Sequence, residues 1–130
     1  MKSYTDLKQS KKLVGILPLE SADMIIVSIG DREGVVTTTM PKETFNMLRT
    51  PFVDIRETTP CWSLAALIAI LPRFIEFKGD KYYLRFMKEY VEYANDEVSI
   101  TGRCLHTTGN DNLVDACVEM ILKLKENNLL

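Results

Sequence analysis

The sequence is poor in the residue types that most often carry catalysis or bind metals. It has one histidine, His106, and three cysteines, Cys61, Cys104 and Cys117, which are widely spaced and form no CxxC motif. An odd number of isolated cysteines favours free buried thiols in a reducing compartment over a disulfide framework. Cys104 and His106 form one Cys-x-His pair, but zinc needs four ligands, and a second close pair is missing. We therefore expect no metal site and no cofactor.

Long hydrophobic runs and a strong excess of one charge are also absent. The longest apolar run, Leu64 to Leu71, is far shorter than the ~20 residues that span a bilayer. The N-terminal sequence MKSYTDLKQSKK lacks the apolar core of a signal peptide. A net charge of −2 argues against a surface that binds nucleic acid as a whole. These absences predict a cytoplasmic protein with no membrane partner.

The composition that remains is that of an ordinary globular domain. Hydrophobic residues make up 46% of the chain and charged residues 26%, as in typical globular proteins. A chain of 130 residues can bury a core without disulfides or metals. Because no repeat, low-complexity segment or linker divides it, we expect one domain over residues 1–130.

Two of the three main helices that we expect lie near the ends of the chain, at about 3–17 and 111–126. The first begins at Ser3, with Asp6 in the capping-box position, and ends at Pro18. Its expected apolar side consists of Leu7, Val14 and Leu17. The last helix has a complete apolar stripe at helical spacing, formed by Leu113, Ala116, Cys117, Met120, Ile121 and Leu124.

The third helix, over residues 60–71, is expected at the centre of the core. Thr59 can cap it, Pro60 suits its first position and Pro72 stops it. Only Ser63 is polar between these ends, so we expect the helix to be buried on nearly all sides.

The strands are expected to form hairpins. A first hairpin is predicted from DMIIVSI and GVVTTTM, which are rich in β-branched residues. A short helix with Pro41 at its first position should follow, and then a short strand in PFVDIR. RFIEFKGDKYYLRFMK predicts a second hairpin, whose Gly79-Asp80 turn would place Phe77 opposite Tyr82 and Ile75 opposite Leu84. A further strand is expected in residues 97–106, with Val98 and Ile100 on one face. Hairpins and helices without βαβ alternation predict an α+β fold with a small antiparallel sheet.

Cys61 is the one candidate nucleophile. At the head of a helix its pKa would fall in the field of the helix dipole, and His106 is the only histidine that could serve as its base. Around Cys61, however, ETTPCW matches only the last two letters of the papain-like motif C-G-[SA]-C-[WY]. No nearby glycine would let a backbone approach a substrate. The missing parts favour a packing role for Cys61 and a non-enzymatic protein.

The outer face of the second hairpin is the candidate binding surface. The predicted turn places aromatic and charged side chains together there: Phe74, Glu76, Lys78, Lys81, Tyr83 and Arg85. Aromatic rings interleaved with cations suit single-stranded nucleic acid. The alternative is a solvated sheet face with Arg85 lying over Phe74, and the overall acidity of the chain favours this alternative.

Three stretches, QSKKLVGILPLESADM, PCWSLAALIAILP and NLVDACVEMILKLKENNLL, together resemble a family of small proteins of unknown function from gut bacteria and their phages or mobile elements. The resemblance implies a mobile-element origin and a non-enzymatic accessory role, and it carries over no site residues. We therefore expect a small module that binds another protein or a second copy of itself. The alternatives are a nucleic-acid-binding accessory protein that uses the 74–88 hairpin and a small thiol enzyme that uses Cys61 and His106.

Overall fold

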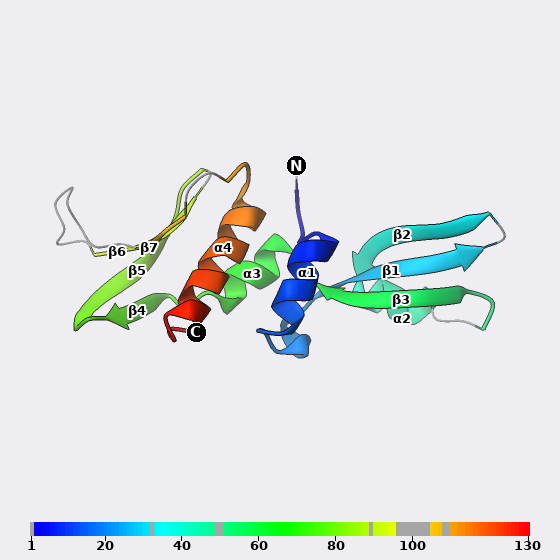
Figure 1. The fold of residues 1–130 in the computed structure, drawn as a ribbon, viewed down its shortest axis with the longest axis horizontal. Coiled ribbons are helices and arrows are strands. Elements are labelled where there is room, and N and C mark those ends of the chain that lie inside the picture. The colour runs from blue at the N-terminus through cyan, green and yellow to red at the C-terminus, as the bar shows by residue number, and fades with distance from the viewer. Residues whose placement is uncertain (1, 32, 49–50, 89, 96–104, 108–109) are drawn as a thin grey trace. The chain divides into compact units, whose positions relative to one another are not determined.

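The protein has an α+β fold, as the sequence predicts. A computed structural model describes residues 2–31, 33–48, 51–88, 90–95, 105–107 and 110–130 (Figure 1). The described strands form two antiparallel sheets instead of the single small sheet that we expected, in the orders β2-β1-β3 and β4-β5-β6-β7. The elements in chain order are α1 (Leu7–Val14), the 3-10 helix η1 (Leu19–Ser21), β1 (Met24–Asp31), β2 (Gly34–Pro41), α2 (Lys42–Leu48), β3 (Asp54–Cys61), α3 (Leu64–Ile70), β4 (Phe74–Phe77), β5 (Asp80–Phe86), β6 (Val91–Ala94), β7 (Leu105–His106) and α4 (Leu113–Glu126).

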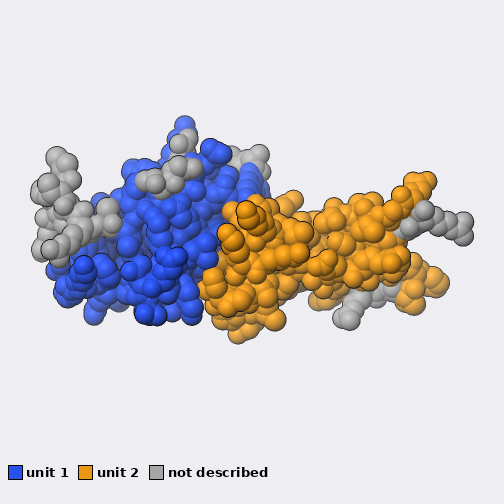
Figure 2. All heavy atoms as spheres, viewed as in Figure 1, with its two compact units in different colours: residues 1–3, 67–130 blue, residues 4–66 orange. Residues whose placement is uncertain are grey.

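The chain folds into two compact units, and each unit has one of the two sheets (Figure 2). One unit consists of residues 4–66, and the other of residues 1–3 with 67–130. The prediction of a single domain over residues 1–130 stays a prediction. Within the described part of the chain, every helix is too short or too polar to cross a bilayer.

In the unit of residues 4–66, the first helix is shorter than the sequence predicts. Asp6 caps it in place of Ser3: its carboxylate accepts from the backbone N–H of Gln9, and the Gln9 side chain accepts from the N–H of Asp6. This reciprocal pair fixes the start one turn later than expected. The predicted apolar side is also wrong at Leu7 and Val14, which are 41% and 38% exposed.

The buried side of that helix follows from its later start. Ser10 and Leu13 are buried within α1, and Leu17 is buried just after it. This side of α1 packs against β3.

The first hairpin is confirmed, since β1 pairs with β2 in antiparallel register from Met24–Pro41 to Asp31–Gly34. The short helix that follows is also confirmed as α2, but Pro41 is the last residue of β2 and the helix begins at Lys42. The strand predicted in PFVDIR is β3, which starts at Asp54 and runs to Cys61.

The helix predicted over residues 60–71 is wrong at its N-terminal end. Thr59, Pro60 and Cys61 continue β3 and pair with β1, and α3 begins only at Leu64. Proline fits here because β3 is an edge strand, where a missing N–H costs no ladder hydrogen bond. Ser63 caps the helix, because its Oγ accepts from the N–H of Ala66 at 3.2 Å.

The central burial expected for this helix is also wrong. Within α3, Leu67 alone is buried, and Ile68 is 37% exposed. Only one side of α3 therefore contributes to the core.

In the unit of residues 1–3 and 67–130, α4 confirms the predicted last helix. Asn112 caps it by accepting from the N–H of Asp115, and Glu119 pairs with Lys123 at 3.0 Å. Most of the predicted stripe is fully buried, and α4 packs against β6 and β7 (Figure 1). The buried side chains of α4 are Val114, Ala116, Cys117, Val118, Met120, Ile121 and Leu124.

The sheet of this unit contains a strand that the sequence analysis missed. β6 pairs with β5 on one side and with the short strand β7 on the other. The strand predicted over 97–106 coincides with β7 only at Leu105 and His106, and Val98, Ile100 and Cys104 lie outside the described residues.

The second hairpin is confirmed with its turn displaced by one residue. Phe77 pairs with Asp80 and Ile75 with Tyr82, so the turn is Lys78-Gly79. Both turn residues have positive φ, 52° at Lys78 and 83° at Gly79, as in a type I′ turn. A one-residue displacement of the turn changes the register by two residues, which leaves the paired residues on the faces predicted for them, whereas Lys78 moves from the predicted outer face into the turn.

We expect Ile121→Ala to lower the free energy of unfolding by about 2–5 kcal/mol, because the side chain is fully buried in α4. Urea unfolding followed by circular dichroism measures the change. Glu126→Ala, at an exposed position of the same helix, is the control and should change it by less than about 0.5 kcal/mol. Equal effects of the two substitutions would contradict the packing of α4.

The turn of the second hairpin gives a second prediction. Gly79→Ala should destabilise the protein by about 1–2 kcal/mol, because a Cβ is unfavourable at its positive φ. No atom lies within 4 Å of that Cβ position, so the cost comes from the backbone alone. Lys78→Asn should have the opposite sign, because asparagine is favoured at the first position of this turn. The same urea titration distinguishes the two, and a stabilising Gly79→Ala would rule out the turn.

Candidate functional site

The outer face of the hairpin formed by β4 and β5 is exposed, as the sequence predicts. Phe74 lies directly opposite Tyr83, and Glu76 lies opposite Lys81. Phe74 is 45% exposed and Tyr83 44% exposed. We call the outward side chains of the four-stranded sheet the outer face.

A cation lies over the two aromatic rings of this face. The ring centroids of Phe74 and Tyr83 are 6.3 Å apart with planes tilted by 52°, a favourable aromatic geometry. The Lys81 ammonium lies 3.9 Å from the Phe74 centroid and 5.7 Å from that of Tyr83. The predicted cation over Phe74 was Arg85, and Lys81 holds that position instead. The contact makes a compact cationic and aromatic patch.

Lys78 is not part of this patch. It belongs to the turn, and its ammonium lies 5.4 Å from the ring of Phe77, which is on the opposite face of β4. Of the binding residues predicted from the sequence, the structure therefore brings together Phe74, Lys81 and Tyr83, with Arg85 two residues further along the same face of β5.

The outer face extends onto β6 and β7, which the sequence analysis missed. Arg85 lies opposite Glu92, and Glu92 lies opposite His106. The ring of His106 contacts that of Tyr90 with centroids 4.6 Å apart. The alternation of apolar and polar residues in Val91–Ala94 was the available signal for β6, but four residues are too few for a confident period. The added residues bring a second carboxylate to the face.

The inner face of the same sheet is packed. Its central side chains Ile75, Tyr82, Val91 and Tyr93 are buried. The Tyr93 hydroxyl donates to the carbonyl oxygen of Pro72 at 2.7 Å, and burial raises the pKa of this phenol. The inner face thus holds the core of this unit, and Phe74 and Tyr83 on the outer face are exposed among the described residues.

Cys61, the candidate nucleophile, is fully buried at the end of β3. Its thiol donates to the carbonyl oxygen of Thr5 at 3.2 Å and lies 3.4 Å from the Thr5 hydroxyl. Burial raises the pKa of the thiol above its ordinary value. Because Cys61 is not in a helix, the expected lowering of its pKa by a helix dipole does not arise.

His106, the only candidate base, belongs to the other compact unit. It lies in β7, against the ring of Tyr90, and its carbonyl oxygen accepts from the Lys123 ammonium. No three His, Cys, Asp or Glu side chains gather as metal ligands among the described residues, which do not include Cys104.

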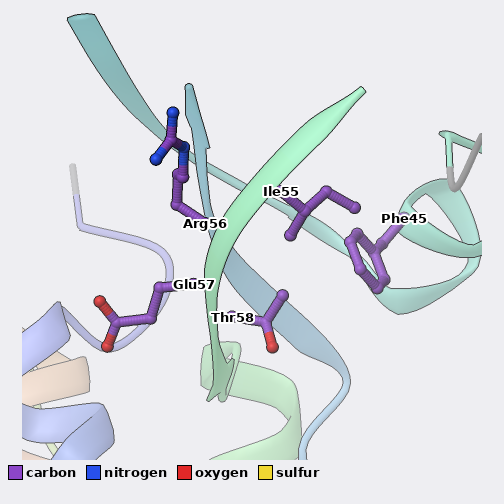
Figure 3. A pocket seen from close by; sticks show the side chains of 5 residues that line it. All are labelled: Phe45, Ile55, Arg56, Glu57 and Thr58. Carbon is purple, nitrogen blue, oxygen red and sulfur yellow. The ribbon is translucent and has the colours of Figure 1, made fainter. Parts of the chain in front are cut away.

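A separate open hollow of about 510 Å³ lies in the unit of residues 4–66. In Figure 3, Phe45 and Ile55 lie beside each other, whereas the side chains of Arg56 and Glu57 point away from them. Arg56 is engaged with Asp54 at 2.9 Å. The hollow offers no set of convergent polar groups that would fix a small ligand.

Neither a protein-family model, nor a curated protein, nor a solved structure matches this chain.

The burial of the thiols gives a third prediction. In a Cys104→Ser variant, a maleimide should label Cys61 and Cys117 slowly under native conditions, since both are fully buried, and rapidly in urea. Mass spectrometry after a timed quench identifies the labelled residue. Rapid native labelling of Cys61 alone would restore the nucleophile hypothesis.

The same burial predicts how stability depends on pH. Burial raises the pKa of Cys117 from 9.0 to about 12 and raises that of Cys61 as well. The folded thiols therefore stay neutral at pH values where unfolded thiols ionise, so their contribution to stability should be complete below pH 9 and should decline toward pH 12. Urea midpoints of the protein and of Cys117→Ala between pH 8 and pH 11 measure this decline, which the variant should show less strongly.

Proposed function

We propose that this chain is a small cytoplasmic accessory protein of mobile-element type, which binds another protein and has no catalytic activity. The outer face of the four-stranded sheet is its binding surface. Phe74 and Tyr83 are the anchors, and Lys81 and Arg85 orient the partner.

One observation carries the proposal. Phe74 and Tyr83, which lie opposite each other on neighbouring strands, remain nearly half exposed on a sheet whose other face is packed. An antiparallel sheet that is covered on one side ordinarily has polar residues on the other. Aromatic side chains beside a cation are the residue types that dominate the energy of protein interfaces.

The charge of the outer face supports a protein partner over nucleic acid. Lys81 lies opposite Glu76, and Arg85 lies opposite Glu92, so each cation has a carboxylate beside it. Binding to a phosphate backbone requires an excess of cations. A surface of mixed sign suits a folded protein with complementary charges.

The aromatic and cationic patch itself favours nucleic acid as the second candidate. Two neighbouring rings with the Lys81 ammonium over them resemble the stacking platforms of single-strand binders. The thiol-enzyme alternative has less support, because the Cys61 thiol is buried and its pKa is raised.

A site-specific experiment tests the proposal. A photo-reactive phenylalanine at position 83 should cross-link a discrete protein in the host cell, and the same group at Phe52, which is 94% exposed, should not. With that protein purified, Tyr83→Ala should weaken binding by at least about 30-fold, as expected of an aromatic anchor. Phe52→Ala should leave the affinity unchanged.

Single-stranded oligonucleotide titrations distinguish the alternative. Binding that weakens steeply with salt, with a slope that Lys81→Ala and Arg85→Ala both reduce, would replace the protein partner by nucleic acid. We expect no such binding at micromolar concentrations.

A further inference from the structure

β2 is an exposed edge strand of the three-stranded sheet. It pairs with β1 on one side only, and in Figure 1 no described element lies along its other side. Residues 34–38 are all exposed, including Val35 at 61% and Val36 at 60%. Alternate residues of such a strand direct their N–H and C=O groups outward, where another strand can pair with them.

The other edge strands of the described sheets carry features that block such pairing, and β2 does not. β3 contains Asp54, Arg56, Glu57 and Pro60 and a register shift opposite Ser28 and Ile29. β4 has four residues and includes Glu76, and β7 has two residues. β2 has eight residues, GVVTTTMP, with no charge and with proline only at its end. Charges, bulges and short strands are how proteins protect sheet edges.

We propose that β2 is a self-association edge, at which two copies of this chain pair their β2 strands antiparallel across a twofold axis. The two sheets then form one continuous six-stranded sheet in the order β3-β1-β2-β2-β1-β3. This inference concerns a different surface from the proposed function and does not depend on it.

The composition of β2 argues for a second copy as the occupant. A twofold axis at Thr37 places Thr37 opposite its own copy, Val36 opposite Thr38 and Val35 opposite Thr39. These three opposed pairs are then all β-branched, Gly34 lies opposite Met40 at the strand end, and no like charges meet between residues 34 and 40, which is the favourable case for cross-strand pairing. A charged peptide would find no complementary charge between Gly34 and Met40. The edge of β3 is less suited to such pairing, because it contains the charged residues Asp54, Arg56 and Glu57, a proline and a register shift.

Opposite charges introduced at Thr37 in two separate variants test whether the twofold axis passes through this residue. Thr37 is exposed and lies 3.3 Å, oxygen to oxygen, from Ser28 on the sheet surface, so Lys and Glu fit there in the monomer. We expect the unmodified protein to be a dimer in sedimentation velocity. Thr37→Lys and Thr37→Glu should each dimerise at least about tenfold more weakly. An equimolar mixture of the two variants should form dimers again, because opposite charges then meet at position 37. Recovery on mixing is specific to a residue that meets its own copy.

Matched variants make each outcome decisive. Thr58→Lys places the same charge on the other edge, in β3, and should leave the dimer intact. Val35→Lys, at a second exposed position of β2, should weaken it even if Thr37→Lys loses its circular dichroism spectrum. A chain that is monomeric at about 0.1 mM, where any useful homodimer is occupied, overturns the inference. So does a dimer that Thr58→Lys weakens as much as the β2 variants do.

Discussion

The unit of residues 4–66 depends on how the buried hydroxyl of Thr5 is satisfied. It accepts from the N–H of Trp62 at 3.1 Å and lies 2.7 Å from the Ser10 hydroxyl, while the backbone N–H of Thr5 donates to the carbonyl oxygen of Trp62 at 2.9 Å. A buried polar group without these partners would cost about 1–3 kcal/mol. These bonds tie the backbone at Trp62 to Thr5, so that β3 extends to Cys61 and α3 starts only at Leu64. The same constraint fixes the chemistry of Cys61, because it encloses the thiol and removes it from any helix terminus.

This network also shows where local sequence rules were insufficient. Thr59-Pro60 has the residue types of a helix N-terminus, and they predict a helix from 60 to 71. Pairing with β1 and the contacts of Thr5, more than 50 residues earlier in the chain, outweigh that weak local preference. The start of α1 is a milder case, because two acceptable caps, Ser3 and Asp6, precede it. The side chain that decides between them is Gln9, and its reciprocal bond to Asp6 places the helix.

The candidate binding face was predictable because the side chains of a strand alternate between its two faces, so the face of each residue depends only on whether its position is odd or even. The turn was predicted one residue late, yet Phe74, Lys81 and Tyr83 kept their face, since a two-residue change of register preserves alternation. The composition of the whole face was not predictable in the same way. Glu92 and His106 join it through β6 and β7, and pairing between strands that are distant in sequence leaves no local pattern. The two cations of β5 read as a basic strip in the sequence, and only the strand order shows that Glu92 balances Arg85.

The two exposed surfaces differ in the physical source of their specificity. In the proposed function, the outer face would select a partner through side chains, so that affinity would depend on a few aromatic groups and orientation on charges of both signs. The β2 edge offers mainly backbone donors and acceptors flanked by valine and threonine, and backbone groups alone do not discriminate among extended strands. The β2 edge would therefore exclude strands with charged or bulky side chains, and a strand without such side chains could pair with it. A second copy of β2 meets that requirement without any further component. In the proposed dimer the two β2 edges pair with each other, so the β3 strands are the outer edges of the six-stranded sheet. Their charges and register shift then prevent further strands from adding.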